Sequence, residues 1–140
     1  MPHRKVHRLG EQATAALLAD EPWGHLPLTQ RPYDGVWGGG VVVGRRDVLL
    51  DAPLDPRYRS WGQEDTSWSL ALACLHGPGW RGDADLLHLF HPPQPRLTRV
   101  WGSEEGRDLY RRYRQARRDP ELMRALIQEG REEEVWAPIR

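Results

Sequence analysis

The stretch Trp61-Gly62-Gln63-Glu64-Asp65-Thr66 sets the frame for the rest of the chain. It places two adjacent carboxylates ahead of an apolar run that follows helical spacing and ends at Gly77-Pro78-Gly79. Glycine and proline at that point predict a helix from Glu64 to His76. We expect the buried side of this helix to consist of Trp68, Ala71, Leu72 and Leu75.

The two carboxylates, Glu64 and Asp65, allow two interpretations. The helix dipole stabilises acidic side chains in a first turn, so the pair can simply mark the start of a helix. Trp61-Gly62, however, is not needed for capping, and glycine there permits a sharp turn that presents the carboxylates at a rim. A carboxylate so placed can accept a proton from a sugar hydroxyl as a general base.

A histidine pair, His88 and His91, lies further along the chain. We predict a strand from Asp85 to Phe90, closed by Pro92-Pro93. Residues three apart on a strand point to opposite faces, but prolines at this end let the two imidazoles converge. A single histidine beside a strand is most often structural, whereas two near a carboxylate pair favour metal binding. Imidazole and carboxylate ligands suit Mn²⁺ among several metals.

The first half of the chain is less regular. Residues 1–8 are polar and basic and predict a loose arm, and Leu9 to Ala19 follow helical spacing. Prolines and glycines over residues 22–35 predict an ordered loop. In Gly38-Gly39-Gly40-Val41-Val42-Val43, the valines predict a short buried strand, and the glycines fit either a tight turn or a ligand-facing loop.

Further helices are predicted in the rest of the chain. Arg45 to Leu50 is expected to form a short helix or turn. Ser103 to Arg118 and Pro120 to Glu133 are expected to form two longer helices. Asp119 is suited to cap the last one, with Pro120 at its first position.

Two charged motifs have simpler interpretations. Asp83-Ala84-Asp85 follows glycines and is best interpreted as a solvated turn rather than a metal motif. Arginines between Arg107 and Arg118 can bind nucleic acid, but Tyr110 and Tyr113 at helical spacing favour a solvated amphipathic face.

The composition is that of a globular chain of 140 residues with zero formal net charge, which argues against nucleic-acid binding through overall charge. The one cysteine, Cys74, excludes an internal disulfide and fits a reducing compartment. The basic start lacks an apolar signal core, and no run approaches the ~18 apolar residues of a membrane span. We therefore expect a cytoplasmic protein. Seven tryptophans can serve as core residues or as platforms for sugar rings.

The order of these motifs resembles the C-terminal half of GT-A-fold glycosyltransferases. It is similar to the galactosyltransferase C-terminal domain and to the related part of polypeptide N-acetylgalactosaminyltransferases. The resemblance covers roughly residues 36–95. It is carried by Gly38 to Val43, Arg45, Leu54-Asp55 to Tyr58, Trp61-Gly62-Gln63-Glu64-Asp65, and His88-Leu89-Phe90-His91.

The resemblance implies an α/β domain with a partial GT-A fold and added C-terminal helices. It divides the chain into an arm, helix and loop over residues 1–35, a transferase-like core over 36–100, and a helical extension over 101–140. The implied reaction moves a sugar from a nucleotide-sugar to a glycan or other hydroxyl acceptor.

The resemblance also implies roles for individual residues. Asp65 is the candidate base and Glu64 binds the acceptor. His88 or His91 helps to hold Mn²⁺ against the donor diphosphate. Substrate-binding roles fall to Trp61 on a mobile loop and to Gly62, Gly39, Gly40 and Arg45.

The chain also departs from the family. Thr66 stands where galactosyl-type members often have a further acid. The nucleotide-binding half with its Asp-x-Asp motif has no counterpart before Gly38. We therefore expect a truncated reading frame or a half that needs a partner chain, and incomplete catalysis by this chain alone. A single lysine, Lys5, among many arginines indicates a high-GC, bacterial genome, where start sites are easily misplaced. A non-catalytic carbohydrate- or partner-binding module and an arginine-rich nucleic-acid-associated protein are the rival interpretations.

Overall fold

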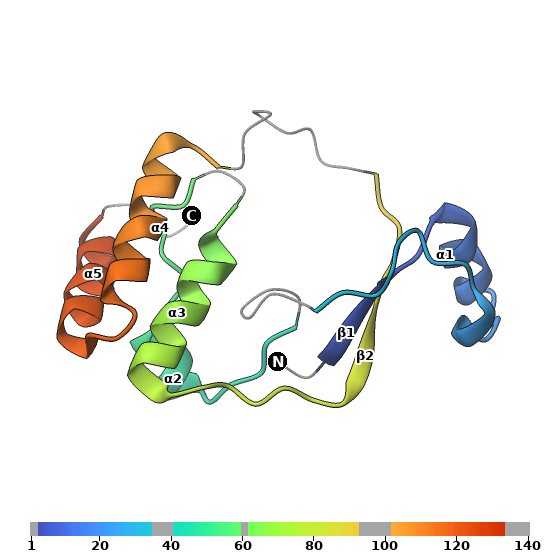
Figure 1. The fold of residues 1–140 in the computed structure, drawn as a ribbon, viewed down its shortest axis with the longest axis horizontal. Helices are drawn as coiled ribbons and strands as arrows, with labels where there is room; N and C mark the ends of the chain where they lie inside the picture. The colour runs from blue at the N-terminus through green and yellow to red at the C-terminus, as the bar shows by residue number, and fades with distance from the viewer. Residues whose placement is uncertain (1–2, 35–40, 60–61, 93–101, 134–140) are drawn as a thin grey trace, which may run out of the picture. The chain divides into compact units, whose positions relative to one another are not determined.

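The computed structural model describes residues 3–34, 41–59, 62–92 and 102–133, and Figure 1 draws their helices and strands. The chain divides into two units. Unit 1 combines Met1–Gly35 with Trp80–Pro95, and unit 2 combines Val36–Gly79 with Arg96–Arg140. Each unit therefore brings together segments that are far apart in the sequence.

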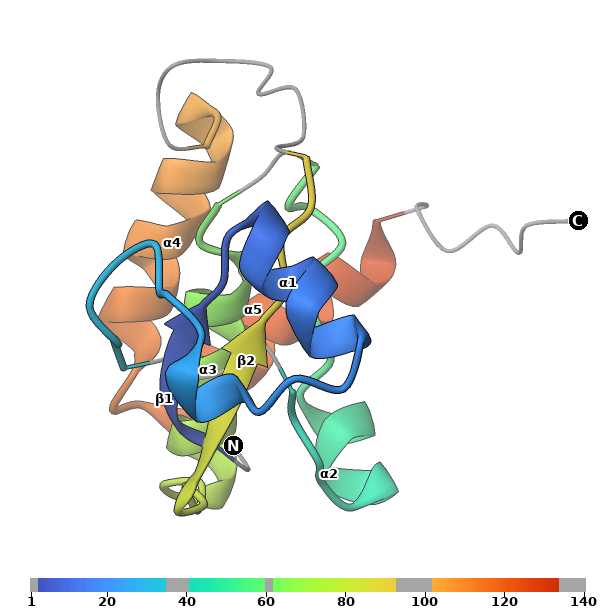
Figure 2. The same ribbon diagram turned by 90° about the vertical axis from the view of Figure 1, so that its right-hand side faces the viewer.

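Unit 1 is built on two parallel strands, β1 (His3–Arg8) and β2 (Ala84–His88), which lie side by side in Figure 2. Their register pairs Val6 with Leu86 and Arg8 with His88. The helix α1 (Glu11–Leu18) and the 3₁₀ turn η1 (Trp23–His25) complete the unit. Its buried apolar side chains are Val6, Leu9 and Ala13.

The strand β1 corrects the prediction of a loose arm over residues 1–8. Its sequence is polar, so the local pattern carries no strand signal. The hydrogen bonds come instead from β2, nearly eighty positions away, and from the loop at Tyr33, whose carbonyl accepts from the Val6 amide at 2.9 Å. Strand formation depends on such neighbours more than on intrinsic propensity.

Unit 2 is helical, and its first two helices are α2 (Arg46–Asp51) and α3 (Glu64–His76), the second of which begins at the candidate carboxylates. The C-terminal pair is α4 (Glu104–Ala116) and α5 (Pro120–Glu132). The helices α3, α4 and α5 contact one another. They enclose a core of buried residues: Ala52, Ala71, Leu109, Tyr113, Ala116, Met123, Leu126 and Ile127.

The helix α3 has the predicted bounds, α4 begins one residue later and ends two residues earlier than predicted, and α5 ends one residue earlier. The Ser103 hydroxyl accepts from the Gly106 amide at 3.0 Å, and the Asp119 carboxylate accepts from the amides of Glu121 and Leu122. These caps satisfy amides that have no partner within the helix. Of the predicted buried side of α3, Ala71 is fully buried and Leu72 and Leu75 pack partly against the core.

The predicted buried strand at the valines is wrong. Residues 41–45 form neither helix nor strand, and Val41 and Val43 are 47% and 81% exposed. Valine favours strands because it packs well on a pleated surface, but a strand also needs a partner for its backbone. Within the part of the chain that the structure describes, this segment has no such partner.

The mixture of helices with a two-stranded parallel sheet agrees with the α/β class. The partial GT-A architecture stays a prediction. None of the helices in the described ranges combines the length and apolar character needed to cross a membrane.

Candidate functional site

The two candidate carboxylates stand at the start of α3, after a sharp backbone turn. Gly62 and Gln63 both adopt positive φ angles, 119° and 72°. Glycine adopts such angles freely, but glutamine in the left-handed region is strained, and such strain clusters at functional sites. The turn that the sequence predicts from glycine is therefore present, and it extends one residue further.

The turn is held by its own side chains. The Gly62 amide donates to Glu64 Oε2 at 2.8 Å, and the Thr66 amide and hydroxyl donate to Asp65 Oδ1 at 2.6 and 3.2 Å. Each contact uses one oxygen of its carboxylate. Thr66 thus orients Asp65.

Gln63 is a residue that the sequence analysis did not single out. Its Oε1 atom is buried and has no hydrogen-bond partner among the described residues. A buried polar atom without a partner is costly, so it is a candidate for contact with a bound molecule. Only the backbone angle and the burial identify it, because glutamine at this position has no sequence signal.

The loop before the carboxylates is tied to the same helix. The hydroxyl of Tyr58 shares a hydrogen bond with that of Ser67, a buried residue of α3. Burial raises the pKa of Tyr58 to about 12, so the phenol stays protonated at neutral pH. The Tyr58 ring also lies 6.5 Å from the ring of Tyr113.

The histidine pair belongs to unit 1. The ring centroids of His88 and His91 lie 5.3 Å apart, so the two imidazoles converge at the end of β2. His91 Nδ1 lies 3.0 Å from the Pro92 carbonyl, and since a carbonyl only accepts, Nδ1 is the donor, and Nε2 is the acceptor whenever the imidazole is neutral. His88 Nδ1 is buried and, within the described residues, has no partner.

The pair fits part of a metal site. Two imidazole nitrogens are suitable ligands for Mn²⁺ or Zn²⁺, and the carbonyl that orients His91 is a typical outer partner of a metal-bound histidine. Among the described residues, however, no group of three or more histidine, cysteine or acidic side chains is arranged to hold a metal ion. The described residues of this pair therefore supply two of the ligands that such a site would need.

The carboxylates belong to unit 2 and the histidines belong to unit 1. The shared cleft that the transferase interpretation requires therefore stays a prediction. Trp61, Gly39 and Gly40 lie outside the described residues. Arg45 precedes α2 and is exposed, and its guanidinium pairs with Asp47 at 2.8 Å.

Two charged motifs are also placed. The predicted solvated turn at Asp83-Ala84-Asp85 is wrong at its end, because β2 begins at Ala84 and Asp85 Oδ2 contacts His7 Nε2 at 2.9 Å. On α4, Arg111 pairs with Asp108, and Arg112 pairs with Glu129 of α5 at 2.6 Å.

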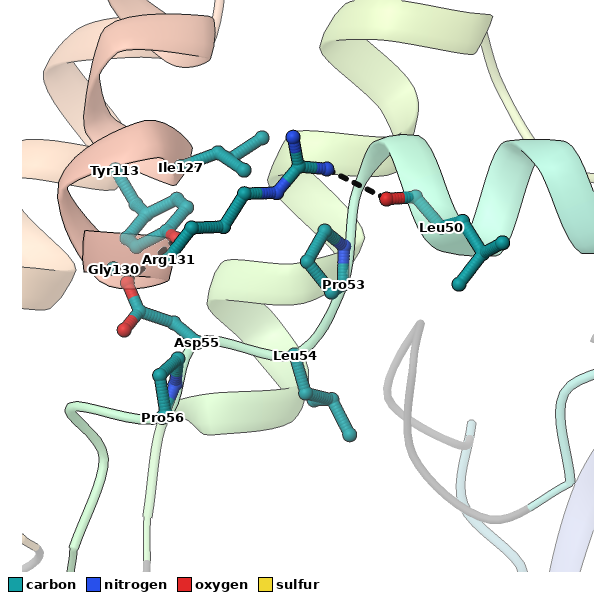
Figure 3. Close-up of a pocket in the computed structure, with 9 residues that line it drawn as sticks. All are labelled: Leu50, Pro53, Leu54, Asp55, Pro56, Tyr113, Ile127, Gly130 and Arg131. Atoms are coloured by element: carbon teal, nitrogen blue, oxygen red, sulfur yellow. Dashed lines mark hydrogen bonds between the residues drawn. The ribbon is translucent and has the colours of Figure 1, made fainter. Parts of the chain in front are cut away.

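A pocket of about 340 Å³ lies within unit 2 (Figure 3). Its walls are largely apolar, from Leu50, Pro53, Leu54 and Ile127. The Asp55 carboxylate also lines it, but both its oxygens already accept hydrogen bonds from unit 2 side chains. The pocket is therefore not a second acidic site.

Comparisons with protein-family models, with curated proteins and with solved structures found no match for this chain.

Proposed function

We propose that this chain provides the acceptor-side part of a glycosyltransferase that moves a sugar from a nucleotide-sugar to an acceptor hydroxyl. The single observation that carries the proposal is the convergence of His88 and His91 at the end of β2, with His88 Nδ1 buried and unpartnered within the described residues. A structural histidine with a buried ring nitrogen is expected to bond to its surroundings through that nitrogen, and His88 does not do so within the described residues. A pair with lone pairs to offer favours a metal.

The proposed metal is Mn²⁺, held by His88 and His91. When bound, it would supply charge that stabilises a departing diphosphate. Its other ligands would be the diphosphate itself and groups from the nucleotide-binding half, for which a partner chain is the proposed source.

The proposed chemistry on the acceptor side depends on the turn before α3. Asp65 takes the proton of the acceptor hydroxyl in the inverting course of the reaction, as the hydroxyl oxygen bonds to the anomeric carbon. The bond from that carbon to the diphosphate breaks, and its electron pair leaves with the diphosphate. Glu64 and Gln63 Oε1 bind other acceptor hydroxyls, because sugar hydroxyls both donate and accept. Arg45, which is exposed before α2, is a further proposed substrate-binding residue.

The test is thermal unfolding of the full chain with Mn²⁺ and UDP, separately and together. A ligand that binds only the folded chain stabilises it by about 2.7 kcal/mol at one hundred times its Kd, so Tm should rise by several degrees. His88→Ala and His91→Ala should lose the Mn²⁺ shift. His25→Ala, an exposed histidine of unit 1, should keep it. If Mn²⁺ raised the Tm of a variant with both His88→Ala and His91→Ala as much as that of the wild type, the histidine site would be excluded.

A carbohydrate-binding module is the second candidate, and Trp80 favours it, since its side chain is 73% exposed in unit 1. An exposed indole can stack on the apolar face of a sugar ring. Stabilisation by free glycans without metal, lost in Trp80→Ala, would support the module. Stabilisation that requires Mn²⁺ would support the transferase.

A further inference from the structure

A buried ion pair ties the loop before the carboxylates to α5. The guanidinium of Arg57 donates to Asp55 through Nε at 3.0 Å and Nη2 at 2.7 Å. The same group donates to the Leu126 carbonyl at 2.8 Å and to Glu129 Oε2 at 3.0 Å. The side chains of Arg57 and Asp55 are only 15% and 4% exposed. Arg57 therefore joins a loop to a helix that follows some seventy positions later.

The same loop is also fixed on α4 and held close to α5. The Tyr113 hydroxyl of α4 donates to Asp55 Oδ2 at 2.8 Å. Figure 3 shows Asp55 beside both Tyr113 and Gly130. A Cβ atom on Gly130 would lie 3.0 Å from Asp55 Oδ1, so only glycine permits this approach without a shift. The helix α4 thus holds the Asp55 carboxylate by a hydrogen bond, and α5 admits it at Gly130.

The fixed part of the loop leads directly to the candidate site. Tyr58 follows Arg57 and bonds to Ser67 of α3. Ser67 lies in the first turn of α3, which also carries Glu64 and Asp65. The hydrogen bond therefore attaches Tyr58 to the helical turn that carries both carboxylates, and a turn that is held in place has few conformations to lose on binding.

We propose that Arg57 is a positioning residue, which holds the turn bearing Glu64 and Asp65 in place through Tyr58 and Ser67. The helices α4 and α5, which lie outside the region of family resemblance, then belong to the acceptor site as its support. The positioning of the turn by Arg57 does not depend on which reaction the chain catalyses. The effect of Arg57 on turnover rests on the proposed transferase function.

The test is hydrogen–deuterium exchange of the full chain, measured on the amides of Gly62, Thr66 and Ser67. Each of these amides is hydrogen-bonded, to Glu64, Asp65 and the Gln63 carbonyl respectively. Arg57→Lys keeps the charge but loses the planar fork. It should speed exchange at these amides by about tenfold while amides from Leu70 to His76 keep their rates. Tyr58→Phe should act on the same amides.

Arg112→Lys is the matched control, because Arg112 pairs with the same Glu129, and its side chain bonds to that helix rather than to the loop at Asp55–Tyr58. Its exchange at the three amides should equal that of the wild type. Wild-type exchange in Arg57→Lys, or acceleration that is uniform over α3, α4 and α5, would overturn the positioning role.

Enzyme kinetics distinguish the positioning role of Arg57 from the proposed transferase function. In an assay with measurable sugar transfer, Arg57→Lys should lower kcat/KM for the acceptor by about tenfold and leave the donor KM unchanged. Wild-type acceptor kinetics would overturn the link to turnover. Lack of any transfer by the wild type, together with the expected exchange pattern, would reject the transferase and uphold the positioning.

Discussion

The hydroxyl of Tyr113 donates to Asp55 at 2.8 Å, which joins α4 to a loop that precedes it by 58 positions. Both side chains are largely buried, and Tyr113 also contributes its ring to the core. We expect Tyr113→Phe to lower the free energy of unfolding by about 1–3 kcal/mol, because a buried acceptor loses a donor. Urea unfolding measures the change. Tyr110→Phe on the same helix is the control, and an equal loss there would contradict a specific role for the Asp55 bond.

A pH dependence follows from the same carboxylate. Burial raises the pKa of Asp55, but hydrogen bonds from Arg57 and Tyr113 outweigh it and hold the pKa below its usual 3.8. A lowered folded-state pKa stabilises the fold fully above the unfolded value, and that stability is lost as pH falls through the folded value. The unfolding free energy of the wild type should therefore decline from about pH 4 downward.

Asp55→Asn isolates this contribution, because the amide has the same shape and does not titrate. The variant should be less stable than the wild type at pH 7, and the difference should shrink as pH falls below about 4. Chemical unfolding at several pH values measures it. A difference that is constant from pH 7 to pH 2 would show that Asp55 does not contribute through its charge.

Close packing at Gly130 gives a third prediction. In Gly130→Ala the new Cβ would meet Asp55 Oδ1 at 3.0 Å and Cγ at 3.2 Å. Overpacking costs about 1–3 kcal/mol, against a helix-propensity gain for alanine of about 1 kcal/mol. We expect a net loss of stability, seen as a lower Tm. Gly24→Ala, where a Cβ would meet nothing within 4 Å, should change little. A Gly130→Ala variant as stable as the wild type would show that α5 can move away from the loop.

The role of Asp65 is tested by Asp65→Asn. Removing a general base typically costs about 10²–10⁴ in rate, so sugar transfer should fall by that factor in an assay that supplies the nucleotide-binding half. The circular dichroism spectrum should not change, because asparagine can still accept from the Thr66 amide. Asp47→Asn, an exposed acid in α2, should keep full activity. Wild-type rates in the Asp65 variant would remove it from the base position.

Local signals in the sequence predict most of unit 2. The helix from Glu64 to His76 has the predicted bounds, and the caps at Ser103 and Asp119 form as expected. Such helices depend on spacing and on capping residues within a few positions of one another. The turn at Gly62 is also predictable from a local signal, because glycine readily adopts the positive φ angle that the turn requires.

The candidate site is only partly predictable for the same reason. Glu64, Asp65, His88 and His91 stand out by residue type, and their proposed roles remain to be tested. Gln63 and Arg57 do not stand out in the sequence, because only their burial and their contacts in the folded chain make them candidate site residues. Arginine and glutamine are common surface residues, and no local spacing distinguishes a buried one.

The sequence by itself determined the bounds of α3 and placed those of α4 and α5 to within two residues, because capping and apolar periodicity act over a few residues. Only the tertiary structure decided that the polar segment His3–Arg8 is a strand and that the valines at 41–43 are not. Strands draw their hydrogen bonds from distant segments, so the presence of a partner outweighs local propensity. The link from Arg57 to Glu129 was decided in the same way, since it exists only once α5 packs against the loop.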